Sequence, residues 1–195
     1  LSDPAIDVYD NAMFIIALDY LLEMAPDSPQ ASRWKSLREG IERNVRAHLW
    51  DVKRQKFIPH IYPEKSPIPE GFDELAIHYH GGTAIAIEAG LLSEDEIRSV
   101  NAQMLENVRL SGMPSIGLTL YPVYPDGFFH GGMSKAYLYQ NGGDWTWFGG
   151  RMIQQLVVNG MVEEAYAEIH PMIERVIQND GFYEWYGKGG VPSGS

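Results

Sequence analysis

The chain has 195 residues, of which 45% are apolar, and no cysteine. It is therefore long enough for one domain with a substantial core, and it has no disulfide framework. A formal net charge of −11 argues against a nucleic-acid partner, which needs a basic surface. No stretch approaches the ~18 apolar residues of a membrane span. The sequence begins at Leu1 without a signal-like leader, so we expect a soluble protein, or a piece of a longer one, of unknown compartment.

Hydrophobic patterning predicts helices in three pairs, each made of an apolar helix followed by an amphipathic one. The apolar helices are expected at 12–24 and 83–92 and from about 145 to 159, and the amphipathic ones at about 29–50, 93–111 and 162–180. Ser93 and Glu96 form a capping-box pattern at the start of the second amphipathic helix. Short β-hairpins or extended pieces are expected between the pairs.

The three pairs form an internal repeat. Their polar starts, Tyr9, Tyr79 and Tyr139, lie about 70 and about 60 residues apart. We therefore expect a single all-α domain of three helical-hairpin repeats, at about 1–65, 66–130 and 131–195. Apolar first helices beside half-exposed second helices indicate two concentric layers, as in a partial (α/α)6 toroid; an open solenoid is the alternative. Parallel inner helices would bring the three starts together on one face.

The stretch 139–151 is unlike an ordinary core helix, since it holds four glycines and two tryptophans. Asp144 is expected to be the N-cap of the helix that follows. Trp145, Trp147 and Arg151 on its first turns suit a sugar, which needs flat apolar faces and polar groups for its hydroxyls. A tight helix–helix crossing with an aromatic core explains the same residues equally well.

Three segments resemble the six-hairpin toroid glycosidases, the group of neutral invertases, trehalases and mannosyl-oligosaccharide glucosidases. Tyr9–Ile16 resembles a Val-Asp-Ser-Gly-Phe-Trp-like segment of the invertase-like members, and Asp10 matches its general acid. Tyr139–Thr146 resembles their Tyr-His-Asn-Gly-Gly-Ser-Trp-Pro segment, with Asp and Thr replacing Ser and Pro. Phe182–Lys188 resembles their Trp-Pro-Glu-Tyr-Tyr-Asp-Gly segment, and Glu184 matches its general base.

The resemblance implies an inverting glycoside hydrolase that acts on α-glucoside-type or related oligosaccharides. Asp10 would be the acid and Glu184 the base, with their carboxyl groups about 6.5–9.5 Å apart. Asp10 could instead be a plain N-cap, and Glu184 a surface carboxylate. Six hairpins of about 65 residues need roughly 390 residues, so we expect half a toroid, completed by a missing half or by self-association.

The residues expected to contact the sugar lie at or near the three repeat starts or in the final aromatic strand. They are Tyr9, Asn11, His80, Gln140, Asn141, Asp144, Trp145, Arg151 and Trp185. Structural loop bonding is an equal alternative for Gln140, Asn141 and Arg151. Neither a cofactor nor a metal is expected, because His78 and His80 have metal-ligand spacing but no third ligand is evident.

Two other functions remain open at this point. A sugar 2-epimerase on a similar toroid would use histidines such as His78, His80 or His130 for proton transfer. A non-catalytic helical-repeat protein would bind carbohydrate or act as a scaffold. Replacing Glu184 with Gln separates these functions, because it should abolish hydrolysis only in a hydrolase.

Overall fold

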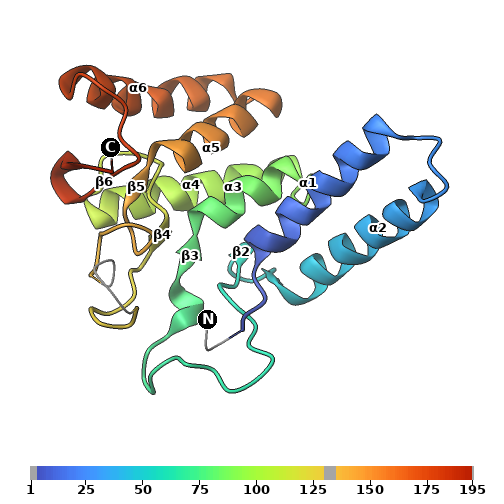
Figure 1. Cartoon of the computed structure of the whole chain (residues 1–195). Coiled ribbons are helices and arrows are strands. Elements are labelled where there is room, and N and C mark those ends of the chain that lie inside the picture. The colour runs from blue at the N-terminus through green and yellow to red at the C-terminus, as the bar shows by residue number, and fades with distance from the viewer. Residues whose placement is uncertain (1–3, 130–134, 195) are drawn as a thin grey trace.

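A computed structural model describes residues 4–129 and 135–194, and in this part of the chain the helices come in three consecutive pairs (Figure 1). The pairs are α1 (Val8–Met24) with α2 (Ala31–His48), α3 (His80–Glu88) with α4 (Glu94–Ser111), and α5 (Thr146–Val158) with α6 (Val162–Gln178). The predicted all-α class with helical-hairpin repeats is confirmed.

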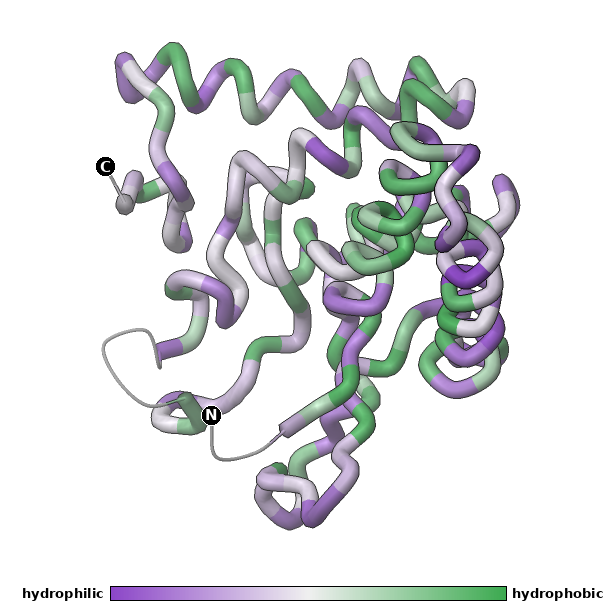
Figure 2. Tube along the Cα trace, turned by 45° about the vertical axis from the view of Figure 1, so that its right-hand side comes forward, coloured by the Kyte–Doolittle hydropathy of each residue, from purple (hydrophilic) through white to green (hydrophobic). Residues whose placement is uncertain are grey.

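The first helix of each pair belongs to an inner row. α1 packs against α2 and α3, α3 packs against α5, and α5 packs against α6. The innermost helix, α3, is buried at every position from His80 to Ile87. The second helices cover the row, and Figure 2 shows apolar and polar residues alternating along α6, as expected for a helix with one face on the core. The fold is therefore a two-layered arc.

One apolar core joins the three pairs. Ala12 and Ile15 of α1, Ile85 of α3, and Met152 and Leu156 of α5 are all fully buried in the same cluster. Because the pairs share this core, the position of each helix start is fixed relative to the other two.

Two helix starts differ from the sequence prediction. α1 begins four residues earlier than expected, at Val8, and its N-cap is Asp7, whose side chain accepts a hydrogen bond from the Asp10 amide at 2.9 Å. Asp144 is not the N-cap of α5, because it lies in a strand and Trp145 precedes the helix without a side-chain cap. The capping box of Ser93 and Glu96 at α4 is present as predicted.

Short antiparallel strands tie the connecting loops together. They are β1 (Trp50–Asp51), β2 (Lys56–Phe57), β3 (His78–Tyr79), β4 (Leu120–Tyr121), β5 (Asp144–Trp145), β6 (Trp185–Tyr186) and β7 (Pro192–Ser193). β1 pairs with β2, β3 with β4, and β5, β6 and β7 form one sheet. A bridge between Leu118 and Asp144 links the β4 segment to β5. These pairings hold the loops at the starts of α3 and α5 against each other.

Candidate active site

A cavity of about 440 Å³ lies where the inner helices begin. Its walls come from the starts of α1, α3 and α5 and from the loops beside them, so the three repeat starts do meet on one face. The described lining residues are Asp7, Val8, Tyr9, Pro59, His60, Tyr79, Gly81, Gly82, Thr119, Gln140 and Phe148. Its size falls within the usual range for small-molecule sites.

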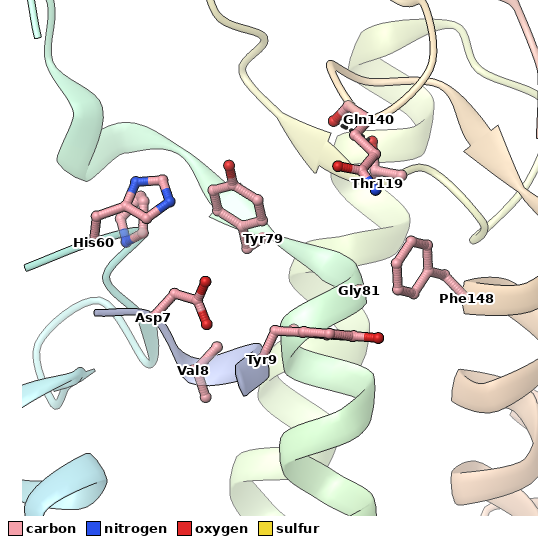
Figure 3. A pocket seen from close by; sticks show the side chains of 11 residues that line it. Asp7, Val8, Tyr9, His60, Tyr79, Gly81, Thr119, Gln140 and Phe148 are labelled. Carbon is pink, nitrogen blue, oxygen red and sulfur yellow. Dashed lines mark hydrogen bonds between the residues drawn. The ribbon is translucent and has the colours of Figure 1, made fainter. Parts of the chain in front are cut away.

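Phe148 of α5 and Tyr9 of α1 form an apolar part of the wall. Their ring centroids are 6.3 Å apart in an edge-to-face arrangement. Gly81 of α3 makes this approach possible, because a Cβ there would lie 2.7 Å from Cε1 of Phe148. Figure 3 shows the Tyr9 side chain crossing the first turn of α3, with its hydroxyl on the side where Phe148 lies.

Asp7 is the carboxyl group on the cavity surface. Burial raises its pKa, and the negative charge of Asp10 adds to that rise. The hydrogen bond from the Asp10 amide and the proximity of His60 act in the opposite direction. Asp7 is therefore a half-buried carboxyl group with an elevated pKa, the property that a general acid needs.

His60 lines the cavity beside Asp7 (Figure 3), and its ring is held by Glu74. Oε1 of Glu74 lies 2.7 Å from Nδ1 of His60, and it accepts hydrogen bonds from the hydroxyls of Tyr62 at 2.8 Å and Tyr124 at 2.6 Å. Burial alone would raise the pKa of Glu74, but these hydrogen bonds hold it below its usual value. Glu74 is therefore an ionised anchor for the imidazole ring.

Gln140 and Thr119 form the opposite wall (Figure 3). The hydroxyl of Thr119 donates to the carbonyl of Gln140 at 2.9 Å and accepts from the amide of Gly142 at 3.0 Å. The loop before α5 is therefore fastened to the strand after α4. The Gln140 side chain is exposed and lines the cavity, and its contact with a sugar stays a prediction.

A row of aromatic rings runs from the cavity to the C-terminal strands. It consists of Tyr9, Phe148, Trp145, Tyr139 and Trp185, with successive centroids 6.3, 6.0, 4.9 and 6.3 Å apart. Glu184 precedes the last ring, and its side chain is exposed. Glu184 is not among the residues that line the cavity. The row of rings therefore runs from Tyr9, which adjoins the predicted acid Asp10, to Trp185, which adjoins the predicted base Glu184.

Asp144 is fully buried and takes part in an internal ion pair. Its Oδ1 lies 2.8 Å from Nη1 of Arg175, and Ser115 Oγ donates to its carboxylate at 2.7–2.8 Å. The guanidinium of Arg175 also lies 3.8 Å from the ring centroid of Tyr186. Asp144 therefore offers no accessible oxygen to a sugar, contrary to the role predicted for it, and instead joins α6 to the sheet of β5 and β6.

Two further predicted contacts are buried. Asn141 binds the backbone of Tyr124 through both ends of its amide, at 2.8 and 3.1 Å. His80 is the first residue of α3, and its side chain is buried with Nε2 3.0 Å from Nδ2 of Asn107. Burial lowers the pKa of His80 to about 3. Neither side chain reaches the cavity surface.

Arg151 is engaged within the protein as well. Its guanidinium pairs with the carboxylate of Glu88 at 2.8 Å and lies 5.4 Å from the ring centroid of Trp147. Arg151 thus links α5 to α3.

The predicted acid, Asp10, is exposed in the first turn of α1 and does not line the cavity. Asn11 donates a hydrogen bond to the carbonyl of Asp7 at 2.7 Å and so supports the N-cap. The prediction missed Asp7 and His60. The sequence did contain a signal for Asp7: it lies three residues before Asp10, the spacing of an N-cap and a residue of the first helical turn. If Asp7 is the N-cap, Asp10 lies in the first turn of the helix.

Two of the histidines proposed for an epimerase, His78 and His80, are not placed for proton transfer with a ligand in the cavity. His78 and His80 are both buried, with ring centroids 5.0 Å apart, while His130 falls outside the described residues. In the described ranges, no group of three His, Cys, Asp or Glu side chains is arranged to hold a metal ion. None of the helices in these ranges has the length and apolarity needed to cross a membrane.

Comparison with known proteins gives matches in structure only. No protein-family model and no curated protein sequence matches the chain. A GH63 mannosylglycerate hydrolase from Thermus thermophilus, in complex with Tris and D-glycerate, is similar with a TM-score of 0.70 and 18% identity over 98% of this chain and 42% of that one. The same hydrolase in complex with glucose gives a TM-score of 0.72 and 16% identity over 99% and 42%.

A sialidase is also similar, with a TM-score of 0.70 and 13% identity, over all of this chain and 18% of the sialidase. At these identities the likeness shows the fold alone. The chain has the fold of part of a helical toroid glycosidase and spans less than half the length of the solved structures, which confirms the predicted resemblance to a partial toroid.

Proposed function

We propose that the protein is a glycoside hydrolase and that the cavity at the starts of α1, α3 and α5 belongs to its active site. The observation that carries this proposal is the meeting of three inner-helix starts around a half-buried carboxyl group of raised pKa. The structural similarity to GH63 mannosylglycerate hydrolase supports it.

We assign the general acid to Asp7 in place of Asp10. Asp7 lines the cavity and is half-buried, and burial raises its pKa, whereas Asp10 is exposed outside the lining. An acid of this kind protonates the leaving oxygen while the glycosidic bond breaks.

We keep Glu184 as the general base, as the sequence predicted. Glu184 adjoins Trp185, the last ring of the aromatic row that begins at Tyr9 in the cavity. Its exposed carboxylate suits the activation of a water molecule, which attacks the sugar from the face opposite the acid. The two carboxyl groups come from opposite ends of the chain, one at the N-cap of α1 and the other beside β6.

The substrate we propose is an oligosaccharide or glycoside of the α-glucoside type. The aromatic rings of Tyr9 and Phe148 would face the sugar ring, and Gln140 and Thr119 would bind its hydroxyls. The similar hydrolase is known in complex with glucose, which supports a hexose as the ligand class.

We further propose that more helical hairpins cover both ends of the arc and complete the ring. Large apolar side chains are exposed on α1 and on the α5–α6 pair. They are Met13, Phe14, Tyr20, Leu21 and Met24 at one end and Trp147, Val157, Val158, Ile173 and Ile177 at the other. At the second end, α5 and α6 also flank an apolar groove of about 330 Å³. Apolar surface of this kind is stabilised by burial against further helices.

Ile177 gives a test of ring completion, because 72% of its surface is exposed in the arc. If another hairpin covers it, Ile177→Asp should lower the thermal midpoint of the complete protein by several degrees. An unchanged midpoint would show that this edge faces solvent.

The catalytic roles are tested with glycosides that differ in leaving group. Asp7→Asn should lower kcat about 10²- to 10⁴-fold for an alkyl glycoside and far less for a dinitrophenyl glycoside, whose leaving group needs no proton. Glu184→Gln should lower kcat for both substrates, because each needs an activated water. Asp10→Asn is the comparison variant: it removes only a minor contribution to the pKa of Asp7, so it should change both rates far less than Asp7→Asn does. Full activity of the Glu184→Gln variant on both substrates would refute the hydrolase mechanism.

A further inference from the structure

His60 lines the cavity, and one of its two ring nitrogens is held by a carboxylate. Nδ1 lies 2.7 Å from Oε1 of Glu74, and the same oxygen accepts from Tyr62 and Tyr124. The ring also packs edge-to-face on Tyr79, with centroids 5.4 Å apart. Because Nδ1 is directed to Glu74, Nε2 is the atom available to a ligand.

His60 also lies on the same side of the cavity as Asp7, while Gln140, Thr119 and Phe148 form the other side (Figure 3). If Asp7 protonates the glycosidic oxygen, the group that leaves with that oxygen is the one beside Asp7. A group bound by His60 would therefore be the aglycone and not the sugar ring that is attacked.

The charges around this side favour a neutral ligand. Among the described residues that line the cavity, none is a lysine or an arginine. The ring of His60 already faces the ionised Glu74, and Asp7 is a carboxyl group on the same side of the cavity. A carboxylate on the ligand would meet neither a lysine nor an arginine among the described lining residues, and it would lie near the ionised Glu74.

Resting on the function proposed above, we propose that His60, positioned by Glu74, forms a subsite for a neutral, polyhydroxylated aglycone such as a polyol or a second sugar. Nε2 of His60 exchanges a hydrogen bond with an aglycone hydroxyl next to the bond that is cleaved. This specificity differs from that of an enzyme for an acidic aglycone, since the similar mannosylglycerate hydrolase is known in complex with D-glycerate.

The test compares three substrates that share one sugar and carry a glycerol, a glycerate or a propyl aglycone. For the wild-type protein, kcat/KM should be higher for the glycerol than for the glycerate compound. His60→Phe should lower kcat/KM for the glycerol compound about three- to tenfold, the effect of one hydrogen bond, and leave the propyl compound within about twofold. His60→Gln keeps a polar group near the position of Nε2 and should restore part of the loss.

Glu74→Gln serves as a second variant, because it loosens the ring without removing it, and should give a smaller loss with the same selectivity. His170→Phe, on the exposed side of α6, is the matched control and should leave all three substrates unchanged.

The outcomes separate this subsite from the hydrolase function. An equal loss on the glycerol and propyl compounds, or no loss on either, would overturn the subsite while the hydrolase stands. A wild-type preference for the glycerate compound would also overturn it. A wild-type protein that hydrolyses none of the three would refute the hydrolase function, and the subsite with it.

Discussion

The buried ion pair between Asp144 and Arg175 should be among the most sensitive points of the fold. Their side chains are 0% and 5% exposed, and the charged groups lie 2.8 Å apart. Replacing Asp144 with Asn keeps the shape of the side chain but leaves the guanidinium of Arg175 without its anion. Removing one partner of a buried pair typically costs about 3–5 kcal/mol.

That cost is a large part of the total stability of a domain, which is about 5–15 kcal/mol. For a chain of this length it corresponds to a fall in the thermal midpoint of roughly 6–20 °C. Thermal and urea unfolding of Asp144→Asn, followed by circular dichroism, would measure it. The double variant Asp144→Asn, Arg175→Met should recover part of the loss, because the unpaired charge is then gone.

The exposed pair of Glu106 and Arg109 on α4 provides the control. Glu106→Gln should leave the midpoint unchanged, because water and salt screen an exposed pair. If Asp144→Asn is as stable as Glu106→Gln, the pair is not the fastening between α6 and the β5–β6 sheet that the structure indicates.

Two more predictions concern the cavity wall. Gly81→Ala should weaken binding of a sugar, measured by tryptophan fluorescence, because its Cβ would displace the ring of Phe148; Gly150→Ala in α5, which meets nothing within 4 Å, should not. Glu74→Gln should lower the free energy of unfolding at pH 7 by about 2 kcal/mol, since hydrogen bonds to its charged form are lost. The pKa of Glu74 is depressed in the folded protein. This stabilisation is therefore fully present above pH ~4.3, the pKa of an unperturbed glutamate, and is lost as the pH falls through the pKa of the folded protein. In acid-range urea titrations the two proteins should converge; a constant difference would contradict the ionised anchor.

Local patterns were sufficient to predict the helix pairs and their two layers. The α4 start is an example, since Ser93 and Glu96 satisfy each other's backbone within one turn. The gathering of the three repeat starts also followed from the sequence, because parallel inner helices have their starts on one face.

The exact start of α1 could not be predicted from such patterns. Asp7 and Asp10 are both acceptable N-caps, and the choice between them changes which carboxyl group lies on the cavity. Burial of Val8 against the α3 start favours the earlier helix start.

Contacts between segments that are distant along the chain could not be predicted from the sequence either. Asp144 looks like a helix cap until α6 brings Arg175 beside it, and His60 is an ordinary loop residue until Glu74 packs behind it. Both pairs depend on how helices and loops pack, not on the spacing of residues along the chain.

We propose that the starts of α1, α3 and α5 form one sugar site. The most direct test is a titration of the isotope-labelled protein with a non-hydrolysable glycoside, followed by the backbone amide signals in NMR spectra. The perturbed amides should belong to the cavity wall, with Tyr9, Gly81 and Gln140 shifting together from their three helix starts. Perturbations confined to another surface, such as the groove between α5 and α6, would contradict it, as would the absence of any shift at saturating sugar.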